Sequence, residues 1–240
     1  MAMDPESRKK LQIFLLLAII LAGARAAYIV YDRYQERKAD EQPKKEVALK
    51  ADYYVQPKKL RPYDLKSARE LTKQPVWVKV GYSSTYYPYN SSARKTDFAH
   101  EASTLLPLQK LQITDVAVES SPQSKDSKQV LARFSLDGKT YSVPIGAVRS
   151  GEYKIYSDEM FFVEDPRDLY KHWSTDTWKA IENHEIVKGM NELQASFALG
   201  LGVPQGSGDY GSRTLQYPNG GKPVTVTFRG DKAAEIVPVS

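Results

Sequence analysis

The stretch that decides the fold is IVKGMNELQASFALGLGVP, residues 186–204 of the chain. Asn191 is a good helix N-cap, and Gln194 follows it at the spacing of a capping box. Alanine and leucine then favour helix, until Gly200 offers the positive backbone angle that commonly ends one. Pro204 prevents any continuation. The pattern therefore predicts one short helix from about residue 191 to about residue 200.

Beyond a glycine-rich loop, the pattern changes from helix to strand. Residues 214–217 and 224–228 are rich in β-branched and aromatic side chains, and the turn sequence PNGGKP separates them at 218–223. A further apolar run at 233–239 supplies a third strand. We expect a helix followed by an antiparallel β-meander.

This order resembles the SmpA/OmlA (BamE-like) family, the small outer-membrane lipoproteins of the barrel-assembly machinery. The resemblance covers the last quarter of the chain, and the residues that carry it are Gly189, Met190, Gly200, Pro204, Tyr217 and Phe228. The chain departs from the family at residues 201–203 and has no lipobox cysteine, so a lipoprotein role in barrel assembly is not implied. Domains of this type are binding or scaffolding modules outside the cytoplasm, and the resemblance implies interaction instead of catalysis.

Composition excludes several classes of function. The chain has 240 residues, of which 41% are hydrophobic, enough for one or two cores. It has no cysteine, which excludes disulfides, thiolate metal sites and cysteine nucleophiles. The net charge is +5, but no block of Lys and Arg is long enough for a nucleic-acid-binding arm, and we expect no nucleic-acid partner.

The N-terminal residues predict a membrane segment. A basic group at residues 8–10 precedes an apolar run that extends from Leu11 to Tyr31 with one interruption at Arg25. This length suits a helix crossing the ~30 Å hydrocarbon core of a bilayer. A cleaved signal peptide is the alternative, because small-residue sites lie at 22–24 and 24–26. We favour the uncleaved anchor, since the apolar character continues past both sites.

Residues 32–60 are charged and mixed in sign, which is typical of a solvated tether. This tether carries more basic residues than the segment before the apolar run, and the positive-inside rule would place it in the cytoplasm. The signal-like layout and the family resemblance favour the opposite orientation. We expect an inner-membrane, single-pass protein whose C-terminal bulk lies in the periplasm.

Residues 61–163 are expected to form a small β domain. Asp64 caps a short helix ending before Pro75, and strand patterns follow at 76–80, 108–118, 129–136 and 139–143. Asp137-Gly138 is a two-residue hairpin signal, whereas residues 144–148 suggest a 3₁₀ turn. The order resembles a bacterial SH3-like barrel, in which an aromatic loop often lines a peptide or glycan groove. The candidate partner-binding residues are then Tyr82, Tyr86, Tyr87 and Tyr89, although such tyrosines equally often pack a core.

Residues 164–240 comprise a helical connector and the BamE-like α+β domain. Asp165 and Pro166 open one helix, and Ser174 caps the next. Trp173 and Trp178 lie close together here, and we expect them to join the connector to the domains on either side in one compact unit.

Catalytic chemistry finds little support in the sequence. The three histidines are scattered, so we assign no metal and no other cofactor. The glycines of residues 200–211 match no phosphate-binding motif. The carboxylates of Glu159, Glu164, Asp165 and Asp168 could form an acid pair, but Asp165 and Asp168 are already explained as helix-start residues.

The sequence therefore predicts an α+β protein with an N-terminal transmembrane helix, a small SH3-like barrel and a BamE-like domain. Its domains are residues 1–31 (anchor or signal peptide), 32–60 (tether), 61–163 and 164–240. The function expected is a membrane-anchored scaffold or accessory subunit of a cell-envelope or membrane complex, without enzymatic activity. Its partners would be the membrane, through residues 11–31, and a protein. Alternatives are a peptidoglycan-binding protein and a carboxylate-dependent hydrolase.

Overall fold

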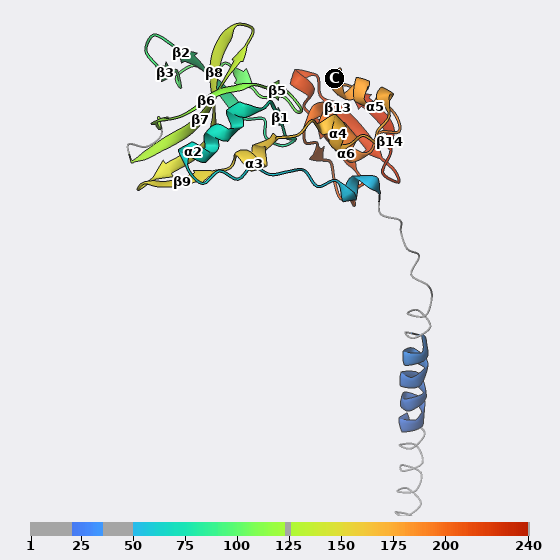
Figure 1. Cartoon of the computed structure of the whole chain (residues 1–240). Helices are drawn as coiled ribbons and strands as arrows, with labels where there is room; N and C mark the ends of the chain where they lie inside the picture. Colours follow the sequence, from blue (N-terminus) through green and yellow to red (C-terminus); the bar gives the residue numbers. More distant parts are fainter. Residues whose placement is uncertain (1–20, 36–49, 123–125, 240) are drawn as a thin grey trace, which may run out of the picture. The chain divides into compact units, whose positions relative to one another are not determined.

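The computed structural model of the chain describes residues 21–35, 50–122 and 126–239. The chain divides into two units, residues 1–50 and residues 51–240 (Figure 1). In the first unit, residues 21–35 are helical and their side chains are exposed. The second unit is compact and holds all three sheets formed by the described residues.

The predicted transmembrane helix is wrong. No helix among residues 21–35, 50–122 and 126–239 combines the length and apolar character needed to cross a bilayer. The described helical residues 21–35 carry Arg25, Asp32 and Arg33, charges that are costly in hydrocarbon. Residues 11–20 of the predicted span lie outside the described residues. The assignments "transmembrane" and "single-pass" are corrected accordingly.

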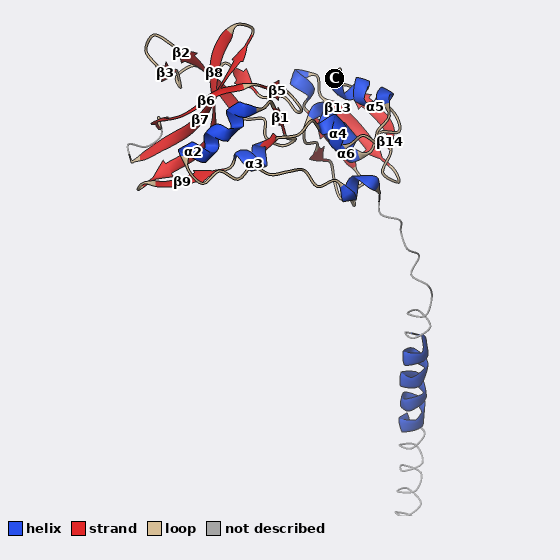
Figure 2. Ribbon diagram, in the orientation of Figure 1, coloured by secondary structure: helices blue, strands red, loops and turns tan. Residues whose placement is uncertain are grey.

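The second unit mixes helices and strands, and its largest sheet is a half-barrel (Figure 2). Its strands are β2 (Thr85–Asn90), β3 (Lys95–Thr96), β4 (Ser103–Thr104), β6 (Ile113–Ser120), β7 (Ser127–Leu136), β8 (Lys139–Arg149) and β9 (Glu152–Ile155). The order is β3-β2-β8-β7-β6, with β4 beside β2 and β9 beside β8. Neighbouring strands pair antiparallel.

The strand spacing predicted a small barrel, and the sheet observed is a half-barrel. The helix α2 (Leu65–Ala68) and the 3₁₀ segment η2 (Arg69–Lys73) pack against β6. Asp64 caps α2 as expected, with its side chain accepting from the Ser67 N–H. Because Ala68 and Leu71 are buried in the same core as β6, a helical segment covers apolar surface that closure of the sheet would otherwise bury.

The β7–β8 hairpin contains one feature that was predicted correctly from the sequence and one that was not. Asp137 and Gly138 both have positive φ, as a type I′ turn requires, which confirms the hairpin predicted at this position. The 3₁₀ turn predicted for residues 144–148 is wrong, because β8 continues through them. The register shifts at this point, because Val130 and Leu131 of β7 pair with Gly146 and Pro144 and leave Ile145 of β8 as the extra residue of a bulge. Proline has no N–H for a regular ladder, and bulges are among the places where sheets accept it.

A small second sheet joins the two halves of the unit. Its order is β10-β1-β5, formed by β10 (Phe161–Phe162), β1 (Val76–Val78) and β5 (Lys110–Leu111). Side chains alternate across a strand, so β1 serves two cores. Val76 and Val78 are buried in the core of the half-barrel, whereas Trp77 packs on the core of the helical half.

The C-terminal half contains the predicted helix and meander. Its elements are α3 (Ser157–Met160), α4 (Pro166–Leu169), α5 (Thr175–Glu182), α6 (Glu192–Leu199), β11 (Val203–Pro204), β12 (Thr214–Tyr217), η3 (Asn219–Gly221), β13 (Val224–Phe228) and β14 (Ala233–Pro238). The last four strands form an antiparallel sheet in chain order. Asn191 and Gln194 make the predicted capping box of α6, and Gly200 ends it at φ 86°.

The motif residues of this half are structural. Tyr217 and Phe228 are buried beneath α6, and each contributes about 1.5–3 kcal/mol of burial free energy. Gly189, at φ 89°, donates its N–H to the Ala233 carbonyl (3.0 Å), and the Ala233 N–H donates to the Met190 carbonyl (2.7 Å). Residues 189–190 therefore attach the segment before α6 to β14.

Trp173 packs in the core of the helical half with Tyr170, Phe197 and Phe162. Trp77, Val80 and Leu108 from the β half contact the same core, as does Trp178. This is the joining role expected for the two tryptophans, and residues 51–240 form one compact unit.

Candidate functional site: a tryptophan-lined groove

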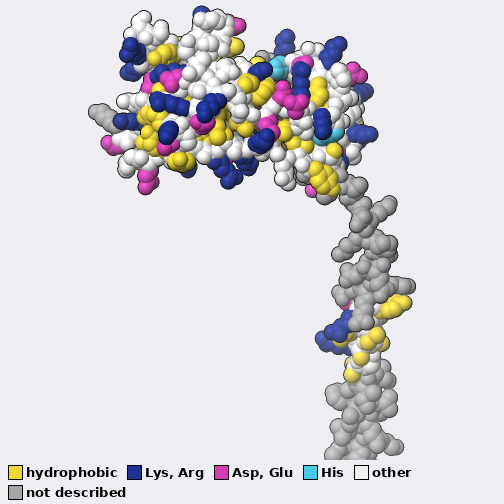
Figure 3. All heavy atoms as spheres, viewed as in Figure 1, with side chains coloured by type: hydrophobic (Ala, Val, Ile, Leu, Met, Phe, Trp, Pro, Cys, Tyr) yellow, Lys and Arg dark blue, Asp and Glu magenta, His cyan; other side chains and the backbone are white. Residues whose placement is uncertain are grey.

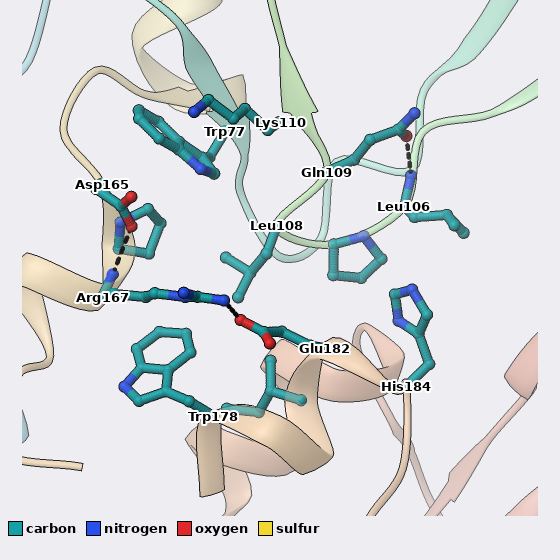
Figure 4. Close-up of a pocket in the computed structure, with 13 residues that line it drawn as sticks. Trp77, Leu106, Leu108, Gln109, Lys110, Asp165, Arg167, Trp178, Glu182 and His184 are labelled. Carbon is teal, nitrogen blue, oxygen red and sulfur yellow. Dashed lines mark hydrogen bonds and ion pairs between the residues drawn. The ribbon is translucent and has the colours of Figure 1, made fainter. Parts of the chain in front are cut away.

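A groove of about 480 Å³ lies where the β half meets the helical half of the second unit (Figure 4). We call it the Trp77–Trp178 groove. Its lining residues are Trp77, Leu106, Pro107, Leu108, Gln109, Lys110, Asp165, Pro166, Arg167, Trp178, Ile181, Glu182 and His184. They come from β1, from β5 and the loop before it, from the start of α4, and from α5 and the residues just after it. The volume falls in the range typical of ligand pockets, about 300–1,000 Å³.

The loop wall is held rigidly against β1. The Leu108 N–H donates to the Val78 carbonyl (2.9 Å), and the Val78 N–H donates to the Gln109 carbonyl (3.1 Å). Leu108 has φ 56°, an uncommon angle for leucine that these bonds maintain. The side chain of Gln109 accepts from the Leu106 N–H (3.0 Å), while the Leu106 side chain is 49% exposed at the rim.

The helical wall is placed by its caps. Asp165 accepts from the Arg167 N–H (2.9 Å), with Pro166 at the first position of α4, and Ser174 caps α5 through the Thr177 N–H (3.2 Å). Both caps confirm the sequence prediction. They set Arg167 and Glu182 facing one another as an ion pair across the helical wall, with side chains 59% and 45% exposed.

Aromatic rings form the upper and lower walls in Figure 4. Trp77 is half-buried, and the ammonium of Lys110 lies 5.3 Å from its ring centroid, a cation–π contact. Trp178 is also half-buried, and its ring lies 5.2 Å from that of the buried Trp173. Burial, reinforced by the charge of Asp52, raises the pKa of the neighbouring Tyr170, so its hydroxyl stays neutral at physiological pH.

Trp173 is fixed from the opposite side by Asp52, in η1 (Ala51–Tyr54). The Asp52 carboxylate accepts from the Trp173 indole Nε1 (2.7 Å) and the Asn191 side-chain amide (3.0 Å), and it pairs with His172 Nε2 (2.5 Å). We call this contact set the Asp52 clasp. It fastens the start of the second unit to the aromatic core behind Trp178.

The histidines are held separately. His184 lines the groove and contacts the Ala198 carbonyl through Nδ1 (3.0 Å), which assigns the proton to that nitrogen. His100 pairs with Asp97, and His172 belongs to the Asp52 clasp. Within the described ranges, no group of three His, Cys, Asp or Glu side chains is arranged to hold a metal ion.

The four tyrosines proposed as binding residues do not share one surface. Tyr86 is 7% exposed and packs edge-on against Phe134 in the core, whereas Tyr87 contacts Phe98. Tyr89 lies under the guanidinium of Arg133 at 4.2 Å.

Tyr82 donates its hydroxyl hydrogen bond to Glu159 (3.2 Å); burial first, then the charge of Glu159, raises the pKa of Tyr82.

The candidate carboxylate pair is not assembled as a catalytic site. Glu164 accepts from the Lys58 N–H (2.8 Å) and forms an ion pair with the Lys58 ammonium. Asp165 caps α4, and Glu159 accepts from Tyr82. Each of these three groups therefore has a separate structural partner.

Sequence reasoning missed the groove. It read residue 77 and residues 108–110 as strand positions and Trp178 as an inward helix position, and it gave none of them a part in a binding site. A tryptophan in a three-residue strand, flanked by valines on the other face, was the available signal, because such a ring must be covered by a different element. Which element covers it depends on contacts between residues about 30 and 100 positions apart along the chain.

Comparisons with protein-family models, with curated proteins and with solved structures find no match to this chain.

Proposed function

We propose that residues 51–240 are a protein-interaction module that binds a short segment of a partner protein in the Trp77–Trp178 groove. The observation that carries the proposal is a pair of half-buried tryptophans opposite one another in a hollow with a fixed loop wall. Tryptophan is enriched among residues that dominate binding energy, especially in pockets with preformed walls. The groove has room for one or two side chains and their backbone, which suits a segment better than a flat domain face.

A role as scaffold or accessory subunit of a cell-envelope or membrane complex extends this proposal. It is supported by the ligand-sized groove between the two tryptophans. Location outside the cytoplasm stays a prediction from the sequence.

The peptidoglycan alternative depended on a shared surface of Tyr82, Tyr86, Tyr87 and Tyr89. These side chains have separate partners within the fold, and one is in the core. We therefore do not propose it as a second function.

Site-specific photocrosslinking in cells producing the full chain is the test. A photoreactive phenylalanine at Leu106, on the rim, is expected to give one discrete adduct with another protein. The same group at Tyr63, which is 79% exposed and does not line the groove, serves as the control. Trp178→Ala is expected to reduce the Leu106 adduct at least fivefold. Equal adducts from both positions, or a Leu106 adduct unaffected by Trp178→Ala, would show that the groove is not the contact surface.

A further inference from the structure

The charge around Trp178 identifies the kind of segment that the groove takes. A second hollow borders the groove, and the two share Arg167, Trp178 and Glu182. The second hollow adds Lys171 and Lys179 to its lining, and the groove adds Lys110. Three basic side chains, Arg167, Lys171 and Lys179, therefore line the second hollow with Trp178, while Lys110 lies over Trp77 at the other side of the groove.

The two acidic groups of this surface are both engaged within the fold. The Asp165 carboxylate accepts from the Arg167 N–H at the start of α4 (2.9 Å), and the Glu182 carboxylate pairs with the Arg167 guanidinium. Among the described residues, Lys171 and Lys179 take part in none of the ion pairs. The surface therefore carries an excess of positive charge close to the half-buried ring of Trp178. Figure 3 shows acidic and basic side chains interspersed over one face of the unit, so this excess is local.

The Arg167–Glu182 pair is well placed to exchange partners. Both side chains are more than two-fifths exposed, and such pairs contribute little to stability because water screens them. The guanidinium also matches carboxylate geometry with two parallel N–H donors. A carboxylate brought in by a ligand replaces Glu182 at little cost, and the excess of basic side chains around Trp178 favours a carboxylate over an ammonium.

We infer that the Trp77–Trp178 groove selects an acidic segment, in which an apolar side chain packs on Trp178 and a neighbouring carboxylate takes Arg167 from Glu182. Glu182 is then an internal substitute for the ligand carboxylate in the unbound protein. The inference rests on the proposed function and adds the partner's chemistry to it.

The test uses two synthetic hexapeptides with the same central Phe-Leu, one flanked by Asp and Glu and the other by Lys. The full chain, labelled with ¹⁵N at its three tryptophans, gives three indole signals. The acidic peptide is expected to shift the signals of Trp77 and Trp178 most, and the basic peptide to leave them in place. The signal of Trp173 is expected to shift less than these two, because Trp173 is buried and bonded to Asp52, although its ring lies 5.2 Å from that of Trp178.

Variants distinguish the replacement of Glu182 by a ligand carboxylate from a general attraction between the basic surface and an acidic peptide. Glu182→Gln is expected to tighten binding of the acidic peptide up to about fivefold, since about 1 kcal/mol of competition is removed. Glu185→Gln makes the same charge change at an exposed position outside the groove and is expected to alter binding less than twofold. Arg167→Met is expected to weaken binding of the acidic peptide to the level of the basic one.

Equal affinity for both peptides, or equal effects of Glu182→Gln and Glu185→Gln, would overturn the inference. A chitooligosaccharide that shifts the same indole signals, while neither peptide does, would overturn it in favour of a glycan ligand. If the crosslinked adduct at Leu106 persists but the peptides are not distinguished, the proposed function stands and only the acidic selectivity fails. If the adduct is also absent, the proposed function fails with it.

Discussion

The tyrosines of β2 and the tryptophans of the groove show two fates of aromatic residues in one chain. The fold itself supplies partners for the tyrosine rings: Tyr86 meets Phe134 and Tyr141 at 5.4 and 5.1 Å, and Tyr89 meets Arg133. Trp77 and Trp178 keep part of their surface open to a hollow. Aromatic density in a sequence therefore does not locate a binding surface. An aromatic ring is available for binding only where segments distant in the sequence leave part of it uncovered in the fold.

The largest expected difference lies in stability. Tyr86→Ala should lower the free energy of unfolding by about 3–5 kcal/mol, because it leaves a cavity in the half-barrel core. Trp178→Ala should cost only about 1–2 kcal/mol, since its ring is half-buried. Urea denaturation of both variants measures the difference, with Tyr63→Ala as an exposed control expected within about 0.5 kcal/mol of the unaltered protein. Equal losses of unfolding free energy in Tyr86→Ala and Trp178→Ala would show that Trp178 stabilises the fold as a core residue does. The proposed contrast between covered and open aromatic residues would then be wrong.

The Asp52 clasp bonds the buried Trp173, and this bond distinguishes Trp173 from the half-buried Trp178. Asp52→Ala leaves the Trp173 indole N–H and the Asn191 amide without their acceptor, and it should lower the free energy of unfolding by about 1–3 kcal/mol. The Trp173 indole signal should also move. Glu101→Ala, at an exposed acidic position, is the matched control and should change neither. An unmoved Trp173 signal in Asp52→Ala would mean that packing alone holds this ring.

The smallest expected effect is an increase in the free energy of unfolding instead of a decrease. The Tyr217 hydroxyl is buried without a hydrogen-bond partner among the described residues, and burial, with the charge of Glu192 adding to it, raises its pKa strongly. Tyr217→Phe should therefore stabilise the protein by up to about 1 kcal/mol. Tyr82→Phe, which removes a hydroxyl bonded to Glu159, should be neutral or slightly destabilising. Thermal unfolding of the two variants checks the sign, and a clear loss in Tyr217→Phe would reveal a partner for that hydroxyl.

The sequence determined the local features of this fold. The caps at Asp64, Asp165, Ser174 and Asn191 formed as predicted, because each depends on residues at most three positions away. The 137–138 turn and the three C-terminal strands were predictable for the same reason.

Features that depend on distant residues were missed. The half-barrel and the β10-β1-β5 sheet need pairings between segments far apart in the chain, and the path of β8 through Pro144 depends on its pairing with the whole length of β7. The candidate site belongs to this second class, because residue 77, the loop before β5 and α5 meet only in the folded unit. The transmembrane prediction failed because it counted apolar residues across Arg25, and the described helical residues do not sustain a span.

The Asp52 clasp has a mechanical consequence. Asp52 stands at the first turn of the second unit and is bonded to Trp173, whose ring rests on Trp178. Tension applied to the chain before Ala51 is therefore carried first by three side-chain hydrogen-bonding contacts beside the groove, and only afterwards by the backbone ladders of the half-barrel. A load on this end would loosen the ligand-facing helices while the sheet is still intact.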